Sequence, residues 1–182
     1  MKRSFFIKVC NRMFASERLL LYRHGSDIPQ SSPAEIRKAT PENIRDVSHF
    51  DTPDKVEKYL KFIEAGDRGY LGYLDGNCVH RSWVKCGPGV VWLHWSMPMT
   101  LKENEAYIHF CETAPQARGK NIFSHMLCHI SEELKHCKNI YICINVNNPA
   151  SIRSVEKAGF ALMKRYRIVA ILNRLIYKRK DE

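Results

Sequence analysis

The sequence predicts an α/β (α+β) fold, in which helices cover both faces of a mixed, largely antiparallel β-sheet. Three observations support this: several short segments alternate in strand fashion, helix-capping signals stand between them, and an Asp-Gly-Asn turn marks a hairpin. A chain of 182 residues that is 45% hydrophobic can bury one core and is too short for two domains of ordinary size. We therefore expect one folded domain.

The first half of the chain is predicted to form two helices and three strands. A short strand over residues 35–39 precedes a helix that begins at Pro41, because proline is favoured in a first helical turn. A second helix lies within residues 52–66, where apolar side chains recur at helical spacing. Strands at 69–74 and 78–85 flank the hairpin turn and are expected to pair in antiparallel fashion.

The second half alternates strands and helices. A strand at 106–112 leads through a turn into a helix after Asn121, and a strand at 139–146 leads into a helix within residues 148–159. A last stretch over residues 160–178 completes the pattern. The order βααββ followed by βαβαβ is satisfied by a mixed sheet between two layers of helices.

Residues 1–33 are expected to form a basic N-terminal arm and residues 34–182 the domain, because a turn-rich stretch over 25–33 separates the two. The arm mixes apolar and basic residues, so it could make weak peripheral contact with an anionic membrane or pack on the domain. Packing is the favoured interpretation.

The formal net charge of +10 calls for a negatively charged partner without selecting one. No zinc finger, RNP motif or aromatic ladder accompanies the basic residues, so nucleic acid is not an expected partner. The chain shows no apolar run long enough to span a membrane, no signal-peptide cleavage pattern and no CxxC pair among its seven cysteines. A cytoplasmic location fits these features.

Histidines and cysteines cluster on one predicted helix and suggest zinc only superficially. No pair of them has a recognised ligand spacing, so no metal site is predicted. The residues concerned are His125, Cys128, His129, His136 and Cys137.

The turn over residues 113–121 is a candidate phosphate site. The N-terminus of the helix that follows presents unpaired N–H groups and about half a positive charge. Gly119 allows close approach of the backbone, while Arg118 and Lys120 add charge beside it. An ordinary turn with solvated basic residues would explain the same segment, so the turn alone does not establish a phosphate site.

Two motifs at the right separation resemble the GNAT superfamily of N-acetyltransferases. Residues 113–121 look like its pyrophosphate-binding loop, with Gln116, Arg118 and Gly119 matching the pattern Q/R-x-x-G-x-G/A. Asn121 departs from the pattern, because it replaces the second small residue. The segment 147–160, NNPASIRSVEKAGF, is similar to its second cofactor motif. The resemblance implies splayed central parallel strands, a GNAT acyltransferase domain over 34–182, and acetyl-CoA as the cosubstrate.

The resemblance also implies which residues contact acetyl-CoA. The backbone at Cys111 and Thr113 would pair with the pantetheine arm, and Asn148 would bond to the amides of that arm. Main-chain N–H groups over 118–123 would hold the pyrophosphate. The expected cofactor-binding residues are Cys111, Thr113, Gln116, Arg118, Gly119, Lys120, Asn121, Ile122, Phe123, Asn148, Ser151, Arg153 and Ser154.

The acid and base that many members of this superfamily use are absent here. Val155 stands where many keep a tyrosine, and Tyr107 and Cys143 stand where two branches place a glutamate. His109 is then the first candidate proton acceptor, because a histidine pKa lies near neutrality, and Glu112 is the second. A strand histidine satisfied by the backbone is the open alternative.

These features predict an enzyme that moves an acetyl group from acetyl-CoA directly to a primary amine of a small molecule. An amine with a pKa of about 7.7–8.0 is partly neutral at physiological pH without a base, which favours an amino sugar or an α-amine over lysine. The alternative is a degenerate GNAT domain that binds acyl-CoA or a protein partner without turnover. A monomer and a homodimer are both compatible with the sequence.

Overall fold

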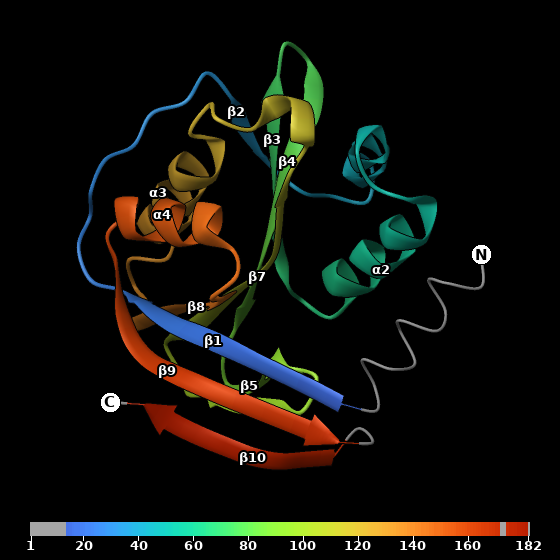
Figure 1. Cartoon of the computed structure of the whole chain (residues 1–182). Helices are drawn as coiled ribbons and strands as arrows, with labels where there is room; N and C mark the ends of the chain where they lie inside the picture. Colours follow the sequence, from blue (N-terminus) through green and yellow to red (C-terminus); the bar gives the residue numbers. More distant parts are fainter. Residues whose placement is uncertain (1–13, 172–173, 182) are drawn as a thin grey trace.

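The computed structural model describes residues 14–171 and 174–181, which build one eight-stranded sheet with the order β10-β9-β1-β8-β7-β4-β3-β2 (Figure 1). Neighbouring strands are antiparallel except for β7 and β8, which are parallel. The strands are β1 (Phe14–His24), β2 (Glu35–Lys38), β3 (Arg68–Leu74), β4 (Asn77–Cys86), β7 (Glu105–Thr113), β8 (Asn139–Asn145), β9 (Phe160–Ile171) and β10 (Arg174–Asp181).

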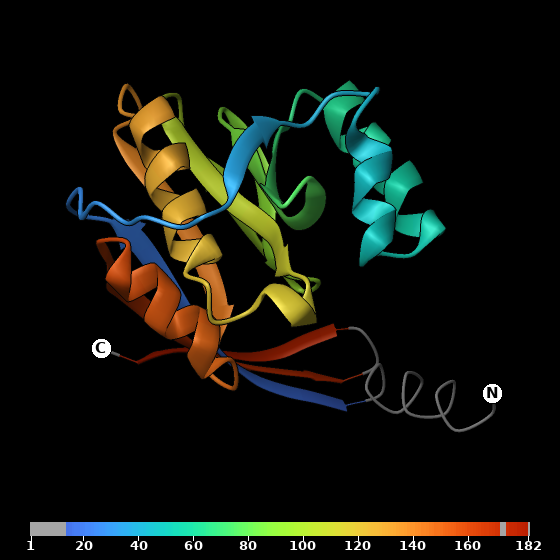
Figure 2. The same cartoon turned by 90° about the horizontal axis from the view of Figure 1, so that it is seen from above.

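Helices cover both faces of this sheet, which confirms the predicted fold class. Figures 1 and 2 show α3 and α4 on one face, and α2 with the short helix η1 on the other. A separate hairpin of β5 and β6 packs Val91 and Met97 against β1, β8 and β9. The bounds are η1 (Ile44–His49), α2 (Pro53–Glu64), η2 (Pro115–Ala117), α3 (Ile122–Glu133), α4 (Pro149–Lys157), β5 (Gly89–His94) and β6 (Met97–Leu101).

The helix expected from Pro41 is wrong in start and type, because η1 is a 3-10 helix that begins at Ile44. The side chain of Asn43 accepts a hydrogen bond from the backbone N–H of Thr40 and donates one to the carbonyl of Lys38. Such local side-chain bonds compete with the helical ladder and hold residues 40–43 in a turn.

Strand β1 comes from the segment expected to be an arm, and it lies in the middle of the sheet between β9 and β8. Leu20 and Tyr22 pack into the core under α3 and α4, while Leu19 and Leu21 pack toward the β5–β6 hairpin. Burial on both faces makes these residues part of the domain. Residues 1–13, and with them the membrane interpretation of the arm, lie outside the described residues.

The parallel strands β7 and β8 pair only over their first halves, from Glu105 with Asn139 to Ile108 with Ile142. Beyond that point β7 carries a bulge: Phe110 has a φ of 49°, and two steps along β4 face three steps along β7. The two strands therefore splay apart, as the resemblance implied. Each then turns into a helix, α3 after β7 and α4 after β8.

No helix in the described part of the chain is long and apolar enough to cross a membrane. Within the same residues, no group of three or more histidine, cysteine or acidic side chains could hold a metal ion. His125 and Cys128 instead bond to the backbone carbonyls of Gln30 and Ile28, in the linker between β1 and β2 that crosses α3.

Candidate active site

A cavity of about 820 Å³ opens where β7 and β8 diverge, between the N-terminal turns of α3 and α4. It brings together most of the residues that the sequence singled out. These are Cys111, Glu112, Thr113, Arg118, Gly119, Asn121, Ile122, Phe123, Asn148, Ser151, Arg153 and Ser154. Gln116 and Lys120 instead line a neighbouring cavity of about 300 Å³, and His109 lines neither.

The loop before α3 presents bare backbone to this cavity. Gly119 has a φ of +82°, and no heavy atom lies within 4 Å of the position that a Cβ would take. No side chain caps the first turn of α3, so the N–H groups there have no intrahelical or side-chain acceptor. An anionic group is stabilised at such a helix start.

Asn121, which stands where a small residue was expected, adopts the left-handed conformation with a φ of 58°. Asparagine tolerates this conformation better than other residues with a Cβ. Its Nδ2 donates to the carbonyl of Ser31 at 2.9 Å, and its Oδ1 accepts from Lys157 Nζ at 3.0 Å. The residue thus ties the loop both to the β1–β2 linker and to α4, a role that its place in the sequence does not indicate.

The opposite wall of the cavity is the start of α4, where Asn148 is the N-cap. Its Oδ1 accepts a hydrogen bond from the backbone N–H of Ser151 at 3.1 Å, which leaves both Nδ2 hydrogens for other partners. Arg153 and Lys157 add positive charge on this wall, and Arg118 adds it from the loop. Three cations and two helix N-termini suit a ligand that carries several phosphate charges.

If acetyl-CoA is the cosubstrate, as the resemblance implies, Asn148→Ala is expected to raise the Michaelis constant for acetyl-CoA more than that for the amine, because it removes an amide donor beside the cavity. It also removes an N-cap, which costs about 0.5–2 kcal/mol of stability. Asn148→Ser is the matched control, since serine keeps the cap and lacks the amide. Steady-state kinetics on both variants separate the roles: equal effects on the two substrates would contradict a cofactor contact.

His80 on β4 is a cavity-lining residue that the sequence analysis did not single out, since a lone histidine in an alternating strand carries no signal. It is fully buried, with Nδ1 2.7 Å from Thr113 Oγ1 and Nε2 2.9 Å from Ser82 Oγ. Burial, with a further contribution from the charge of Arg81, lowers the pKa of His80 to about 3. The ring is therefore neutral at physiological pH and fixes the Thr113 hydroxyl.

His80 is expected to make the protein less stable as the pH falls below 6.5, its ordinary pKa. Between pH 6.5 and about 3 the unfolded chain binds a proton that the folded chain does not. The free energy of unfolding should fall by about 1.4 kcal/mol per pH unit in this window. Urea unfolding from pH 6 to 5 should give a slope in His80→Gln that is smaller by about this amount than the slope in wild type and in His136→Gln, a control at an exposed histidine.

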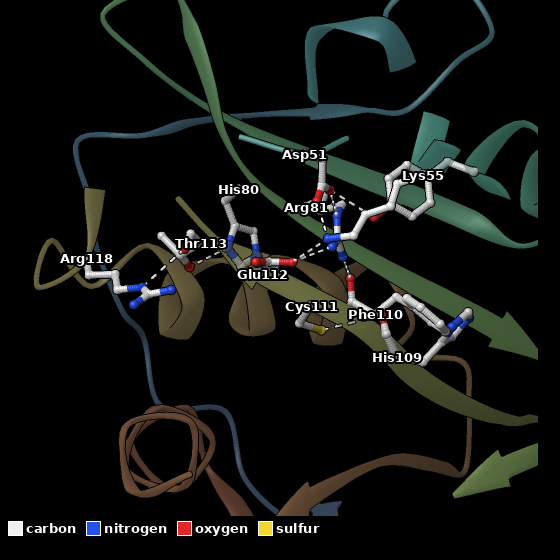
Figure 3. Close-up of polar contacts among 11 residues, drawn as sticks. Asp51, Lys55, His80, Arg81, His109, Phe110, Cys111, Glu112, Thr113 and Arg118 are labelled. Atoms are coloured by element: carbon white, nitrogen blue, oxygen red, sulfur yellow. Dashed lines mark hydrogen bonds and ion pairs between the residues drawn. The ribbon is translucent and has the colours of Figure 1, made fainter. Parts of the chain in front are cut away.

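The two candidate proton acceptors lie in different surroundings (Figure 3). Glu112 lines the cavity with its side chain 38% exposed, and its Oε2 accepts from Arg81 Nη2 at 2.6 Å. His109 lies outside the cavity lining, with Nε2 3.2 Å from Asp67 Oδ2 and its ring stacked on Tyr107. The geometry favours Glu112 over His109, which reverses the order expected from the sequence.

The three residues at the positions where this superfamily usually keeps its acid and base pack in apolar clusters. Val155 is fully buried in the core beneath α3 and α4, and Tyr107 packs in the cluster under the β5–β6 hairpin. Cys143 packs partly buried against that second cluster, and burial raises the pKa of its thiol to about 12. None of them presents a charged group to the cavity.

A splayed parallel strand pair, with a helix start and a bare glycine turn beside it, places the chain among α/β proteins whose strand–turn–helix suits the binding of a phosphate group. The chain belongs to the acetyltransferase (GNAT) family, whose sequence model matches residues 42–160. Family membership supports an acyl-transfer function. No protein of curated function matches the sequence.

Solved structures share the fold at low sequence identity. An acetyltransferase of the GNAT family from Colwellia psychrerythraea superposes with a TM-score of 0.64 and 15% identity, covering 91% of this chain and 60% of that one. An N-acetyltransferase from Staphylococcus aureus superposes with a TM-score of 0.52 and 18% identity, covering 69% of this chain and 82% of that one. A third structure is the GCN5-related glucosamine N-acetyltransferase region of a fungal multi-domain GH3 β-N-acetylglucosaminidase. It superposes with a TM-score of 0.63 and 12% identity, covering 92% of this chain and 22% of that one. The chain thus spans less than two thirds of the length of the first structure and less than a quarter of the length of the third.

Proposed function

We propose that this chain is an N-acetyltransferase that uses acetyl-CoA to acetylate a primary amine of a small molecule. One observation carries the proposal: the cavity at the splay joins an uncapped helix start, a glycine with open space before it, and three cations. Acetyl-CoA fits this arrangement, with its phosphates at Gly119 and the first turn of α3. Its amide arm would run along Cys111 and Thr113, toward Asn148.

Acetyl-CoA would supply an activated thioester, and direct transfer then requires a neutral amine held beside it and a proton acceptor. Glu112 is the one carboxylate among the residues that line the cavity in the described structure. Since Arg81 occupies Oε2, we assign Oε1 to the acceptor amine. The neutral amine nitrogen attacks the thioester carbonyl carbon and forms the new C–N bond, the C–S bond breaks and CoA leaves as the thiolate. The proton that the nitrogen loses passes to Glu112, and the thiolate takes a proton from Glu112 or from solvent to leave as free CoA.

An amino sugar is the first acceptor class to test. The fungal neighbour is a glucosamine N-acetyltransferase region, although at 12% identity its likeness concerns the fold alone. An amine whose pKa is near neutrality also suits a site without a second base. We further propose a cytoplasmic location for the chain, as a monomer or a homodimer.

Acetyl-CoA should raise the melting temperature of the protein, while ATP at the same concentration should not. A panel of amino sugars, amino acid α-amines and lysine peptides should then give release of free CoA with at least one amine. Stabilisation by acetyl-CoA without release on any amine would favour the alternative, a degenerate GNAT domain that binds acyl-CoA or a protein partner. No stabilisation would contradict both the enzyme and an acyl-CoA-binding domain, and would leave only a domain that binds a protein partner.

A further inference from the structure

Arg81 on β4 is a buried arginine that connects the cavity end of β7 to the segment before α2 (Figure 3). Only 3% of its side chain is exposed. Its Nε donates to Asp51 Oδ2 at 2.5 Å, and its Nη2 donates to Glu112 Oε2 at 2.6 Å. Its Nη1 donates to the backbone carbonyl of Phe110. One planar guanidinium thus holds three acceptors from two separate parts of the chain.

Asp51 makes this arrangement rigid on the side of α2. Its side chain is fully buried and also accepts from Tyr59 at 2.9 Å and from Lys55. Burial alone would raise the pKa of Asp51, but the hydrogen bonds from Arg81 and Lys55 outweigh it and leave the pKa below its ordinary value. The carboxylate is therefore charged at neutral pH and anchors the guanidinium, since a buried charge is tolerated only when it is paired.

The bond to Phe110 acts on the bulge of β7. Phe110 has a φ of 49°, a conformation that costs energy for a residue with a Cβ and persists only where its surroundings hold it. A peptide group is planar and trans, so its carbonyl and its N–H point in opposite directions. Because the Phe110 carbonyl is held by Arg81, the N–H of Cys111 points away from Arg81, and Cys111 lines the cavity.

We propose that Arg81 is a positioning residue for acyl transfer, which fixes the Glu112 carboxylate and the Phe110–Cys111 peptide relative to one another at the cavity. This inference rests on the proposed function. Arg81 is not among the cavity-lining residues and acts through groups that are. Its loss should therefore impair the reaction with the amine, while the phosphate cradle, built by the loop over 118–121 and by α3 and α4, stays intact.

The test compares the kinetics of Arg81→Lys and Asp51→Asn with those of wild type. Lysine keeps the charge but lacks the planar fork that reaches three acceptors, and asparagine keeps a hydrogen-bond acceptor without the anchoring charge.

We expect kcat/KM for the amine to fall by about 10- to 100-fold in Arg81→Lys, as for a small misplacement of reacting groups. Asp51→Asn should act in the same direction. The dissociation constant for acetyl-CoA should rise by a smaller factor than the fall in kcat/KM, because the phosphate contacts remain even where a backbone bond at Cys111 is lost. Arg37→Lys, at an exposed arginine paired with Glu35, is the control and should behave as wild type.

Circular dichroism and calorimetry first establish that each variant is folded. Two results would overturn the positioning role of Arg81: equal losses in acetyl-CoA binding and amine turnover, or unchanged kinetics in a folded Arg81→Lys. Neither result affects the proposed function, as long as wild type turns over an amine. If Arg81→Lys does not fold, Asp51→Asn decides by the same criteria, and failure of both to fold would mean a purely structural role. Wild type without turnover on any amine would overturn the proposed function and this inference with it.

Discussion

Gly119→Asp is expected to weaken acetyl-CoA binding by about 100-fold. The φ of +82° costs a residue with a Cβ roughly 1–2 kcal/mol. The new side chain would also point into the open space before the first turn of α3, where its negative charge would compete with the phosphates for the same N–H groups. Isothermal titration of acetyl-CoA measures the effect.

Gly66→Asp is the matched control for backbone strain. Gly66 follows α2 with a φ of +80° and has no heavy atom within 4 Å of a Cβ, so the cost in stability should be similar. It does not line the cavity, so acetyl-CoA affinity should stay at the wild-type value. If Gly119→Asp kept wild-type affinity, or if both variants lost it equally, the assignment of the phosphate cradle would be wrong.

Exchanging the acceptor amine is expected to shift the pH dependence of the reaction. With a single carboxylate at the cavity, the neutral fraction of the amine should govern the rate, so log kcat/KM should rise with pH and level off near the pKa of the amine. Amines of different pKa should move the inflection by the same amount as their own pKa values. An inflection that stays fixed across amines would show that a group of the enzyme controls the rate.

Glu112→Gln should lower kcat/KM by about 100-fold, within the range that general base catalysis usually contributes. His109→Gln should lower it by less than tenfold, because His109 contacts Asp67 and Tyr107 outside the cavity. A loss of 100-fold or more in His109→Gln, with disappearance of a limb near the ordinary histidine pKa of about 6.5, would instead make that histidine the proton acceptor.

The parts of the site that the sequence could predict are those encoded locally. The strand–turn–helix around Gly119 and the start of α4 after Asn148 each depend on a few consecutive residues, and both stand where they were expected. The bulge at Phe110 could not be foreseen, because no glycine or proline marks it. The departure at Asn121 proved compatible with the loop, since asparagine adopts the left-handed conformation that the turn requires.

Contacts between distant residues account for most of what was missed. Arg81 meets Asp51 and Glu112 across 30 and 31 positions of sequence, and no spacing rule connects them. The burial of β1 did leave a signal in Leu19–Tyr22, because a run of apolar residues is typical of a strand covered on both faces. The turn-rich stretch over residues 25–33 that follows it indicated an arm instead.

N-acetyl transfer is tested most directly by measuring free CoA and acetylated product together, with wild type, acetyl-CoA and the amine panel. We expect one equivalent of free CoA per acetylated amine, a rate that depends on the amine, and a rate reduced by about 100-fold in Gly119→Asp at subsaturating acetyl-CoA. Two results would contradict N-acetyl transfer at this cavity: a rate of CoA release that is independent of the amine, or acetyl-CoA that binds and stays intact with every amine.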